Sequence, residues 1–228
     1  MVSRSPRTIL AACTMAFFAT MVARLAISPV VPAISAEFGV SNSLIGLALS
    51  GMWLSYAASQ FPSGLVGDRV GERLVILVAV AGTAIGSLLL ALSPVFALFV
   101  VLTVVLGGAA GLHYSVATTL LSRTFEGTGT AIGIHSAGAP IAGLLAPVAA
   151  AYVGTTLGWR YAVALGALAA VPVIALVVWG IPETEPRRPG ESIRGRVDVS
   201  VLAELLSRPP IAGTVVLSVL AAFVWQGA

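Results

Sequence analysis

Residues 74–121 read LVILVAVAGTAIGSLLLALSPVFALFVVLTVVLGGAAGLHYSVATTLL, a stretch that contains no Asp, Glu, Lys or Arg. The dipeptide Ser93-Pro94 interrupts it and leaves an apolar run on either side. A bilayer core roughly 30 Å thick takes about 20 residues of α-helix, at about 1.5 Å per residue. The stretch therefore predicts two membrane-spanning helices joined by a two-residue turn.

The composition of the whole chain agrees with a membrane protein. Of its 228 residues, 58% are hydrophobic and 9% are charged, and the mean hydropathy is +1.02. A soluble domain carries about 25% charged residues, so a soluble enzyme, a disordered chain and a nucleic-acid-binding protein are excluded. The net charge of +3 comes from scattered Arg residues with no Lys, and the single Cys13 allows no intrachain disulfide.

Six apolar stretches of spanning length occur, and a seventh begins near Ile211. The six are Thr8–Ile34, Ser43–Leu65, Leu74–Leu92, Val95–Leu121, Thr130–Val153 and Tyr161–Ile181. Each should be a helix, because a lone segment in lipid must satisfy its own backbone hydrogen bonds. The sequence predicts an all-α membrane protein with a six-helix bundle over residues 1–181, a charged cytoplasmic linker over 182–210 and a truncated seventh span over 211–228. Residues 201–206 either form a short helix on the membrane face or remain part of the linker.

The placement of arginine predicts the orientation of these spans. With a cytoplasmic N-terminus, the cytoplasmic arginines are Arg4, Arg7, Arg69, Arg73, Arg123, Arg187, Arg188, Arg194, Arg196 and Arg208. Arg160 alone faces outward, and Arg24 lies within a span. The positive-inside rule therefore favours a cytoplasmic N-terminus in a multi-pass protein of the plasma or inner membrane.

The chain also contains an internal repeat with an offset of 87 residues. Without gaps, Ile45-Gly46 align with Ile132-Gly133, Gly51 with Gly138, Gly71 with Gly158 and Arg73 with Arg160. Each unit contains three spans, an odd number, so the second unit must enter the membrane inverted. The bundle is therefore predicted to consist of two inverted three-helix repeats, an arrangement that builds secondary transporters with a binding site near the bilayer midplane.

The loop between the second and third spans, residues 64–73, reads GLVGDRVGER. It is similar to the loop motif of the major facilitator superfamily, in which Gly, Asp-Arg, Gly and a base recur at these spacings. The matching residues are Gly64, Asp68, Arg69, Gly71 and Arg73, whereas Glu72 stands where a base is common. The resemblance covers the whole chain, as the N-terminal half of a twelve-helix transporter with the start of helix seven.

This resemblance implies secondary active transport of a small solute by alternating access, with two six-helix bundles that rock around a central site. In the family, the acidic residue of the loop, here Asp68, reaches across to the second bundle and latches one state. From the residues alone, Asp68, Arg69 and Arg73 would cap and orient a short loop. Both roles stay open at this point.

Span five contains a pattern of small residues and proline: Gly133, Gly138, Pro140 and Gly143. The pattern is similar to a Gly/Pro motif of antiporters in the family. The alternative is packing alone, since small residues let helices approach closely. Pro140 is expected to bend the span. Thr103 occupies the position at which some proton-driven members carry Arg, which argues against proton antiport.

Arg24 is the only charged residue within a predicted span, and no Asp or Glu lies inside one. Ionisable groups at membrane depth are costly and are typical of functional sites. Arg24 therefore either attracts an anion in the translocation path, or it snorkels to the interface or makes a structural hydrogen bond.

His113 and His135 lie about 11 residues on either side of the turn between spans four and five, which predicts a similar depth for both. A histidine pair would carry a proton or bind substrate. Alternatively, the two side chains face different directions and each bonds a backbone carbonyl or a Ser. Further candidates for the pocket are Tyr114, Ser115, Gln60, Tyr56 and Trp53, whereas Trp159 is expected to be an interfacial anchor.

The sequence thus predicts a transporter with no cofactor, no metal site and no enzymatic activity, because the spans offer neither a carboxylate nor a nucleophile with a base. Its expected partners are a small-molecule substrate, a coupling ion, the lipid bilayer, and a C-terminal six-helix half or a partner chain that supplies it. The alternative function is a non-transporting membrane fragment, or a subunit that associates with another helix bundle.

Overall fold

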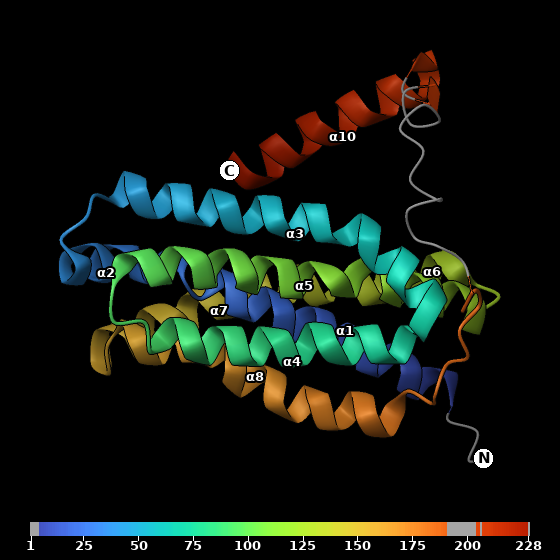
Figure 1. Ribbon diagram of the computed structural model, residues 1–228, viewed down its shortest axis with the longest axis horizontal. Helices are drawn as coiled ribbons and strands as arrows, with labels where there is room; N and C mark the ends of the chain where they lie inside the picture. Colours follow the sequence, from blue (N-terminus) through green and yellow to red (C-terminus); the bar gives the residue numbers. More distant parts are fainter. Residues whose placement is uncertain (1–4, 191–203, 206, 228) are drawn as a thin grey trace. The chain divides into compact units, whose positions relative to one another are not determined.

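The computed structural model describes residues 5–190, 204–205 and 207–227, and its internal contacts divide the chain into two compact units, Met1–Pro189 and Gly190–Ala228. The helices of the first unit (Figure 1) are α1 (Pro6–Leu25), the short 3₁₀ helix η1 (Ser28–Val30), α2 (Val31–Phe38), α3 (Asn42–Val70), α4 (Glu72–Ala91), α5 (Phe96–Thr124), α6 (Thr128–Ser136), α7 (Gly138–Thr156) and α8 (Trp159–Gly180). The second unit contains α10 (Pro209–Gly227). No strand occurs among the described residues, which confirms the all-α fold class.

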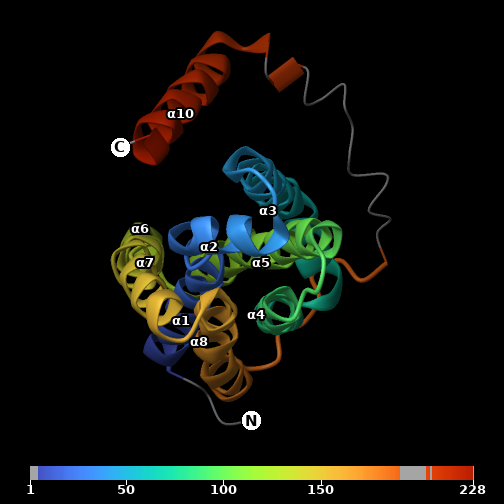
Figure 2. The same ribbon diagram turned by 90° about the vertical axis from the view of Figure 1, so that its left-hand side faces the viewer.

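The long helices of the first unit run side by side along one direction, as Figures 1 and 2 show together. α5 packs between α3 and α4, α8 packs against α4 and α1, and α1 also contacts α7. Small side chains such as those of Ala12 and Ala16 are fully buried, which allows the helix axes to lie close together. Large apolar side chains such as Leu144 and Leu168 are exposed instead, as expected for a surface that faces lipid.

Five helical segments of the described residues are long and apolar enough to cross a membrane. They are Pro6–Phe38, Glu72–Ala91, Phe96–Thr124, Thr128–Thr156 and Trp159–Gly180. α3 has sufficient length, 29 residues, but is not among them. Its middle carries the polar side chains of Ser55, Ser59 and Gln60, which lower its hydropathy. Five predicted spans thus coincide with candidate membrane helices, and the span Ser43–Leu65 remains a prediction within a continuous helix.

Two of the predicted spans are interrupted rather than continuous. α1 ends at Leu25, four residues before Pro29, and α6 ends at Ser136, four residues before Pro140. Proline has no N–H to donate to the carbonyl four residues earlier, so each proline removes a helical hydrogen bond at these points. Each break lies inside one candidate membrane span, so the predictions Thr8–Ile34 and Thr130–Val153 hold as spans, and the break before Pro140 agrees with the bend expected there. Other prolines lie inside continuous helices, so a proline permits a break without enforcing one.

The internal repeat is visible in the backbone at its best-matched positions. Gly71 and Gly158 precede α4 and α8, and both adopt left-handed conformations with φ/ψ of 92°/144° and 102°/159°. Arg73 Nη2 then donates to the carbonyl of Val178 near the end of α8, at 2.9 Å. Arg160 Nη2 donates to the carbonyl of Ser93 just after α4, at 3.2 Å. The start of each helix is therefore tied to the end of the other, as an inverted repeat predicts.

The first unit extends beyond the predicted end of the bundle at residue 181, because residues 182–189 pack against α3 and α4 as described below. In the second unit, α10 covers the predicted seventh span from Ile211 up to Gly227. Residues 191–203 and 206 lie outside the described residues, and with them most of the short helix considered over 201–206.

Candidate transport site and gating loop

The loop motif lies where α3 ends and α4 begins. α3 ends at Val70 because Gly71 has a φ of 92°, a conformation that other residues rarely adopt. A Cβ added at Gly71 would also lie 2.3 Å from the carbonyl oxygen of Thr184, in the segment that follows α8. Glycine is therefore required here both by the turn and by the close approach of residues 182–189.

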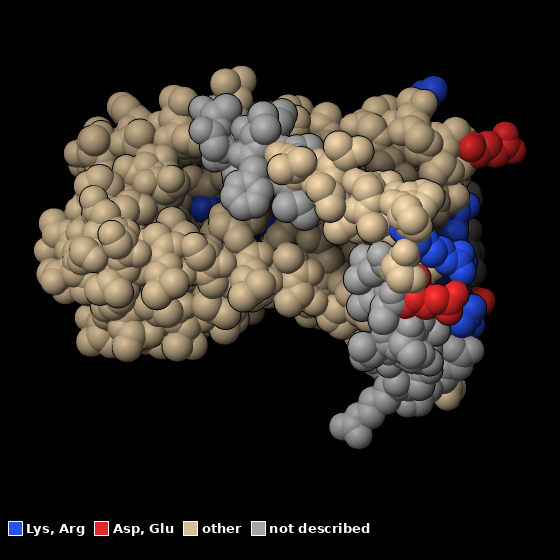
Figure 3. All heavy atoms as spheres, turned by 90° about the horizontal axis from the view of Figure 1, so that it is seen from above, with Lys and Arg blue, Asp and Glu red and all other residues tan. Residues whose placement is uncertain are grey.

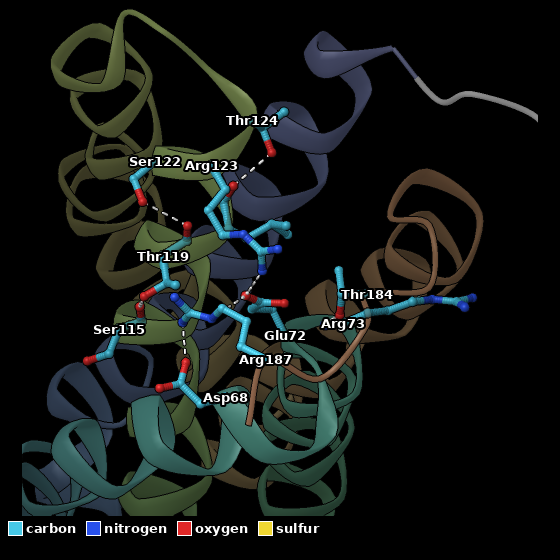
Figure 4. Close-up of polar contacts among 11 residues, drawn as sticks. Asp68, Glu72, Arg73, Ser115, Thr119, Ser122, Arg123, Thr124, Thr184 and Arg187 are labelled. Atoms are coloured by element: carbon cyan, nitrogen blue, oxygen red, sulfur yellow. Dashed lines mark hydrogen bonds and ion pairs between the residues drawn. The ribbon is translucent and has the colours of Figure 1, made fainter. Parts of the chain in front are cut away.

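Two acidic residues near this turn share one arginine of that segment (Figure 4). Arg187 forms an ion pair with Asp68, and its Nε lies 3.7 Å from Glu72 Oε1. The same Glu72 oxygen accepts a hydrogen bond of 2.7 Å from Arg123 Nη1 at the end of α5. Glu72 is only 1% exposed, so two arginines compensate a buried carboxylate. These four residues, Asp68, Glu72, Arg123 and Arg187, are called the charged cluster below.

Arg73 holds the other side of the same segment. Its backbone N–H donates to Thr184 Oγ1 at 3.0 Å, and its Nη1 lies 3.6 Å from Glu183 Oε1. In Figure 4 its guanidinium points away from the charged cluster. The segment after α8 is therefore fastened at two places, on either side of the turn between α3 and α4.

The structure brings together only part of the predicted loop motif. Asp68, Gly71 and Arg73 contact residues 182–189, whereas Arg69 is exposed and a Cβ at Gly64 would meet nothing within 4 Å. Sequence reasoning missed the roles of Glu72, Arg123 and Arg187. A signal existed for the first of these, because it is an acid at a motif position where a base is common.

Charge is otherwise sparse along the bundle. In Figure 3 tan side chains make up most of the visible coloured surface, and a few blue basic atoms show between them in the middle of the view. Among the five candidate spans that the structure describes, Arg24 is the one charged residue away from the span ends. A charged side chain in the interior of a span is costly and is typical of a functional site, so Arg24 is a candidate site residue.

Arg24 is 2% exposed and reaches from α1 to α3. Its Nε donates to the carbonyl of Thr20 at 3.2 Å, and its Nη2 approaches Met21 Sδ at 2.9 Å. The guanidinium carbon lies over the rings of Tyr56 and Trp53, at 3.8 and 4.7 Å from their centroids. Nη1 has no hydrogen-bond partner in the described part of the chain. Burial excludes snorkelling, the bond to Thr20 is the structural hydrogen bond considered as an alternative, and Nη1 is left without a partner inside the bundle.

His113 of α5 and His135 of α6 are in contact, with ring centroids 5.4 Å apart. The expectation of similar depth is confirmed, whereas the alternative that the side chains face different directions was wrong. Phe17 of α1 packs against both rings, at 6.0 and 5.1 Å between centroids, and Tyr114 stacks on His135 at 5.7 Å. The backbone of Cys13 on α1 lies beside both imidazoles, which agrees with the part of the alternative that gave each ring a backbone carbonyl as partner.

The remaining polar candidates are less closely joined to these groups. The hydroxyl of Tyr114 lies 3.5 Å from Ser136 Oγ, which is a long contact. Gln60 and Ser115 are half-buried, and their backbone carbonyls accept hydrogen bonds from hydroxyls of their own helices. Arg24 with its two aromatic neighbours, and the two histidines with Phe17, therefore form the core of the candidate site.

Only one small residue of the span-five pattern lies in close packing. A Cβ at Gly138 would be 2.8 Å from the carbonyl oxygen of Thr14 on α1. A Cβ at Gly133 or Gly143 would meet nothing within 4 Å, and Pro140 is exposed. Packing inside this bundle explains Gly138 and does not explain the other two glycines.

The expectation that Trp159 is an interfacial anchor was wrong. Its side chain is 4% exposed and packs against Phe38 and Phe99, with ring centroids 5.8 and 6.1 Å away. Its Nε1 donates to Glu37 Oε2 at the end of α2. The turn at Gly158 directs this indole into the bundle rather than toward lipid.

Several curated relatives of the chain are named as transporters. A probable sulfoacetate transporter (SauU) of Cupriavidus necator is 29% identical over 163 residues, which cover 70% of this chain and 38% of the relative. The multidrug resistance protein MdtL of Escherichia coli is 28% identical over 197 residues, which cover 85% of this chain and 50% of the relative. The chain thus spans about a third to a half of the length of these relatives.

Two solved transporter structures share this fold. A peptide transporter POT in complex with sulfate has a TM-score of 0.70 at 16% identity, over 96% of this chain and 46% of that one. The human organic anion transporter MFSD10 has a TM-score of 0.63 at 19% identity, over 84% and 52%.

These findings describe a multi-pass membrane protein of a transporter family and not an enzyme. The fold, the internal repeat and the loop motif agree with that description. The model of the Major Facilitator Superfamily matches residues 12–228, and the chain therefore belongs to this family.

Proposed function

We propose that the chain forms the N-terminal bundle of a secondary transporter for a small anionic solute, which works by alternating access with a second six-helix bundle. The observation that carries the proposal is Arg24, a buried guanidinium in the interior of a span with Nη1 left unpartnered. A buried charge without a carboxylate nearby is costly, and a bound anion would compensate it.

The aromatic surroundings of Arg24 favour a small organic anion. Tyr56 and Trp53 offer ring faces beside the guanidinium, so a ligand that bonds Nη1 would also meet apolar ring surface. The names of two relatives fit this class, since one is a probable sulfoacetate transporter and another, from Bacillus subtilis at 24% identity, is a hexuronate transporter. Both named solutes carry an acidic group that a guanidinium recognises.

The charged cluster would gate access from the cytoplasmic side in the cell membrane, with the N-terminus in the cytoplasm. In this assignment Asp68 exchanges Arg187 for a partner on the second bundle during the transport cycle. An exchange of this kind needs partners that water can reach, and the two side chains are 14% and 39% exposed.

Flux measurements in membrane vesicles from cells that express the protein would test the proposal. Radiolabelled sulfoacetate and a labelled hexuronate serve as probes. We expect uptake or counterflow in the wild type, and a loss of at least tenfold in Arg24→Gln and in Arg24→Lys, because a lysine cannot reproduce the planar fork. Arg69→Gln, at an exposed position, is the control and should retain flux.

Failure would take one of two forms. Flux that survives in Arg24→Gln at the wild-type level would remove this residue from the translocation path. No flux of either probe, from a protein that is present and folded in the membrane, would favour the alternative of a non-transporting bundle or a subunit of another assembly.

A further inference from the structure

The hydroxyl groups of Tyr114 on α5 and Ser136 on α6 face each other at a distance longer than an ordinary bond. Their oxygens lie 3.5 Å apart, whereas a bond between two hydroxyls is about 2.7–2.8 Å long. Neighbouring hydroxyls donate to carbonyls of their own helix, as Thr118 does to Tyr114 at 3.0 Å and Thr119 to Ser115 at 2.9 Å. In the described part of the chain the Ser136 hydroxyl makes no such bond. Both hydroxyls are therefore available to a group that lies between them.

The backbone of α6 leaves open space beside this hydroxyl pair. Gly133 lies one turn before Ser136 on the same face of α6. It is exposed, and a Cβ there would meet nothing within 4 Å. Pro140, four residues after Ser136, is exposed as well and has no N–H to donate to the Ser136 carbonyl. Packing inside this bundle does not explain Gly133, whereas a solute beside Ser136 would need the space that its missing side chain leaves.

The groups around the hydroxyl pair suit a neutral polar group. The Tyr114 ring contacts Phe17 and His135, with ring centroids 5.2 and 5.7 Å away, and neither neighbour is a carboxylate or a guanidinium. A phenol and a serine hydroxyl each donate and accept hydrogen bonds. A solute hydroxyl also does both, so it can satisfy this pair, whereas a second charged group would be buried without a counter-ion.

The hydroxyl pair lies within one small solute of Arg24. Tyr56, whose ring lies against the Arg24 guanidinium, touches α5 at Gly111, and Tyr114 follows Gly111 by one turn, or about 5 Å along α5. On α1, Phe17 contacts Tyr114 and precedes Arg24 by two turns, or about 10 Å. The two routes separate the hydroxyl pair from the guanidinium by roughly 5–10 Å. A six-membered sugar ring with its carboxylate spans this distance when it makes a hydrogen bond at each end.

We infer that Tyr114 and Ser136 form a second subsite, which binds hydroxyl groups of the solute while Arg24 binds its acidic group. The solute class is then a hydroxylated carboxylate, such as a sugar acid. A site built to hydrogen-bond hydroxyls rejects an analogue without them, because its own polar groups are left unpaired. Tyr114 and Ser136 are thus specificity-determining residues, and Arg24 selects for charge. The inference rests on the proposed function, because it needs the anion at Arg24.

Two ligands of similar shape separate the two subsites. Galacturonate is a six-membered ring with a carboxylate and several hydroxyls, whereas cyclohexanecarboxylate is a six-membered ring with a carboxylate and no hydroxyl. The Kd of each is measured by titration calorimetry with the protein in nanodiscs. We expect galacturonate to bind about tenfold more tightly, which corresponds to one or two additional hydrogen bonds.

Variants then assign the discrimination to the hydroxyl pair. Tyr114→Phe and Ser136→Ala each remove one hydroxyl with little change in shape. Each should weaken galacturonate binding by about three- to tenfold and leave the Kd of cyclohexanecarboxylate unchanged, whereas a merely structural role would weaken both ligands alike. Ser122→Ala, which removes an exposed hydroxyl from the same helix as Tyr114, is the matched control and should change neither Kd. Arg24→Gln should abolish the binding of both ligands.

The outcomes separate the two proposals. Equal Kd values of the two ligands for the wild type would overturn the hydroxyl subsite and leave the anion site at Arg24 standing. The same holds if Tyr114→Phe and Ser136→Ala weaken both ligands equally, or if neither variant changes the Kd of galacturonate. No binding of either ligand to folded wild-type protein would overturn both proposals.

Discussion

The contact between α3 and α5 gives a sharp test of the packing. Three glycines of α5 lie along this contact, and they differ in the space around them. A Cβ at Gly111 would lie 2.2 Å from the carbonyl oxygen of Tyr56, whereas a Cβ at Gly108 would first meet Ser59 Oγ at 3.5 Å. Gly111→Ala and Gly108→Ala therefore add the same methyl group to the same helix. In Gly111→Ala the methyl group would collide with the backbone of α3, whereas in Gly108→Ala it would make an ordinary van der Waals contact.

The expected difference follows from these distances. A carbon and a carbonyl oxygen settle at about 3.3 Å or more, so Gly111→Ala must push α3 away by about 1 Å, because the obstacle is backbone and cannot rotate aside. Forced overpacking of this kind costs about 1–3 kcal/mol. Both variants gain about 1 kcal/mol of helix propensity, so Gly108→Ala should be neutral or slightly stabilised, and the difference between the two should be about 1–3 kcal/mol.

Thermal unfolding of the purified protein in detergent, followed by tryptophan fluorescence, measures this difference, since Trp53 lies on α3 beside Tyr56. At about 2–4 °C per kcal/mol for a chain of this size, Gly111→Ala should unfold about 2–12 °C below Gly108→Ala. Equal midpoints for the two variants would refute the close approach of α3 and α5. Displacement of α3 would also disturb the Tyr56 and Trp53 rings, so Gly111→Ala should bind sulfoacetate more weakly than Gly108→Ala.

Three further predictions concern the turns and the charged cluster. Gly158→Ala should lower the free energy of unfolding by about 1–3 kcal/mol, because alanine is strained in this left-handed backbone conformation. Gly71→Ala should lower it clearly more, because the added Cβ also meets the segment after α8. Equal losses for the two variants in chemical unfolding would contradict that contact. Glu72→Gln should lower the free energy of unfolding by about 1–3 kcal/mol, since it weakens a buried charged hydrogen bond. As a control, Arg69→Gln at an exposed position should change this free energy by no more than about 0.5 kcal/mol. Similar unfolding midpoints for the two variants would refute the role of Glu72. Raising the salt concentration to about 1 M shortens the Debye length to about 3 Å, so protease cleavage after Arg187 should become faster, and a rate independent of salt would argue against its ion pair with Asp68.

Most of the fold could be predicted because hydropathy is local. Each run of about 20 apolar residues must form its own hydrogen bonds in lipid, and the helices follow from that requirement alone. The helix breaks could be predicted only in part, because the bend expected at Pro140 is present while prolines elsewhere leave their helices unbroken. Pro140 coincides with a break and Pro147 does not, although both lie in one apolar run. What decides between them is the packing of neighbouring helices, which the local sequence does not specify.

In the candidate site too, features set by the local sequence could be predicted, and features set by the packing of distant segments could not. The similar depth of His113 and His135 could be predicted from their equal spacing about one turn, because a helical hairpin places such residues at one depth. The contact between the two rings could not, since it depends on the rotation of α5 and α6 about their axes. The partners of Asp68 and Glu72 could not, since Arg187 lies more than a hundred residues away in the sequence and no periodicity connects them. The depth of Arg24 followed from its position in the span, whereas its aromatic neighbours on α3 depend on the rotation of both helices about their axes.

The position of Arg187 also has a consequence for the order of events during synthesis. Asp68 and Glu72 leave the ribosome long before this arginine does, and at about 5–20 residues per second the delay is roughly 6 to 24 seconds. During that time the corner between the second and third spans carries acidic groups whose later partner does not yet exist. Arg187 follows α8 in the chain, so its ion pairs with Asp68 and Glu72 form only after α8 has been synthesised. These ion pairs therefore require that all helices of the first unit have already been made. A nascent chain that stops before residue 187 would lack the contacts of Arg187 with Asp68 and Glu72.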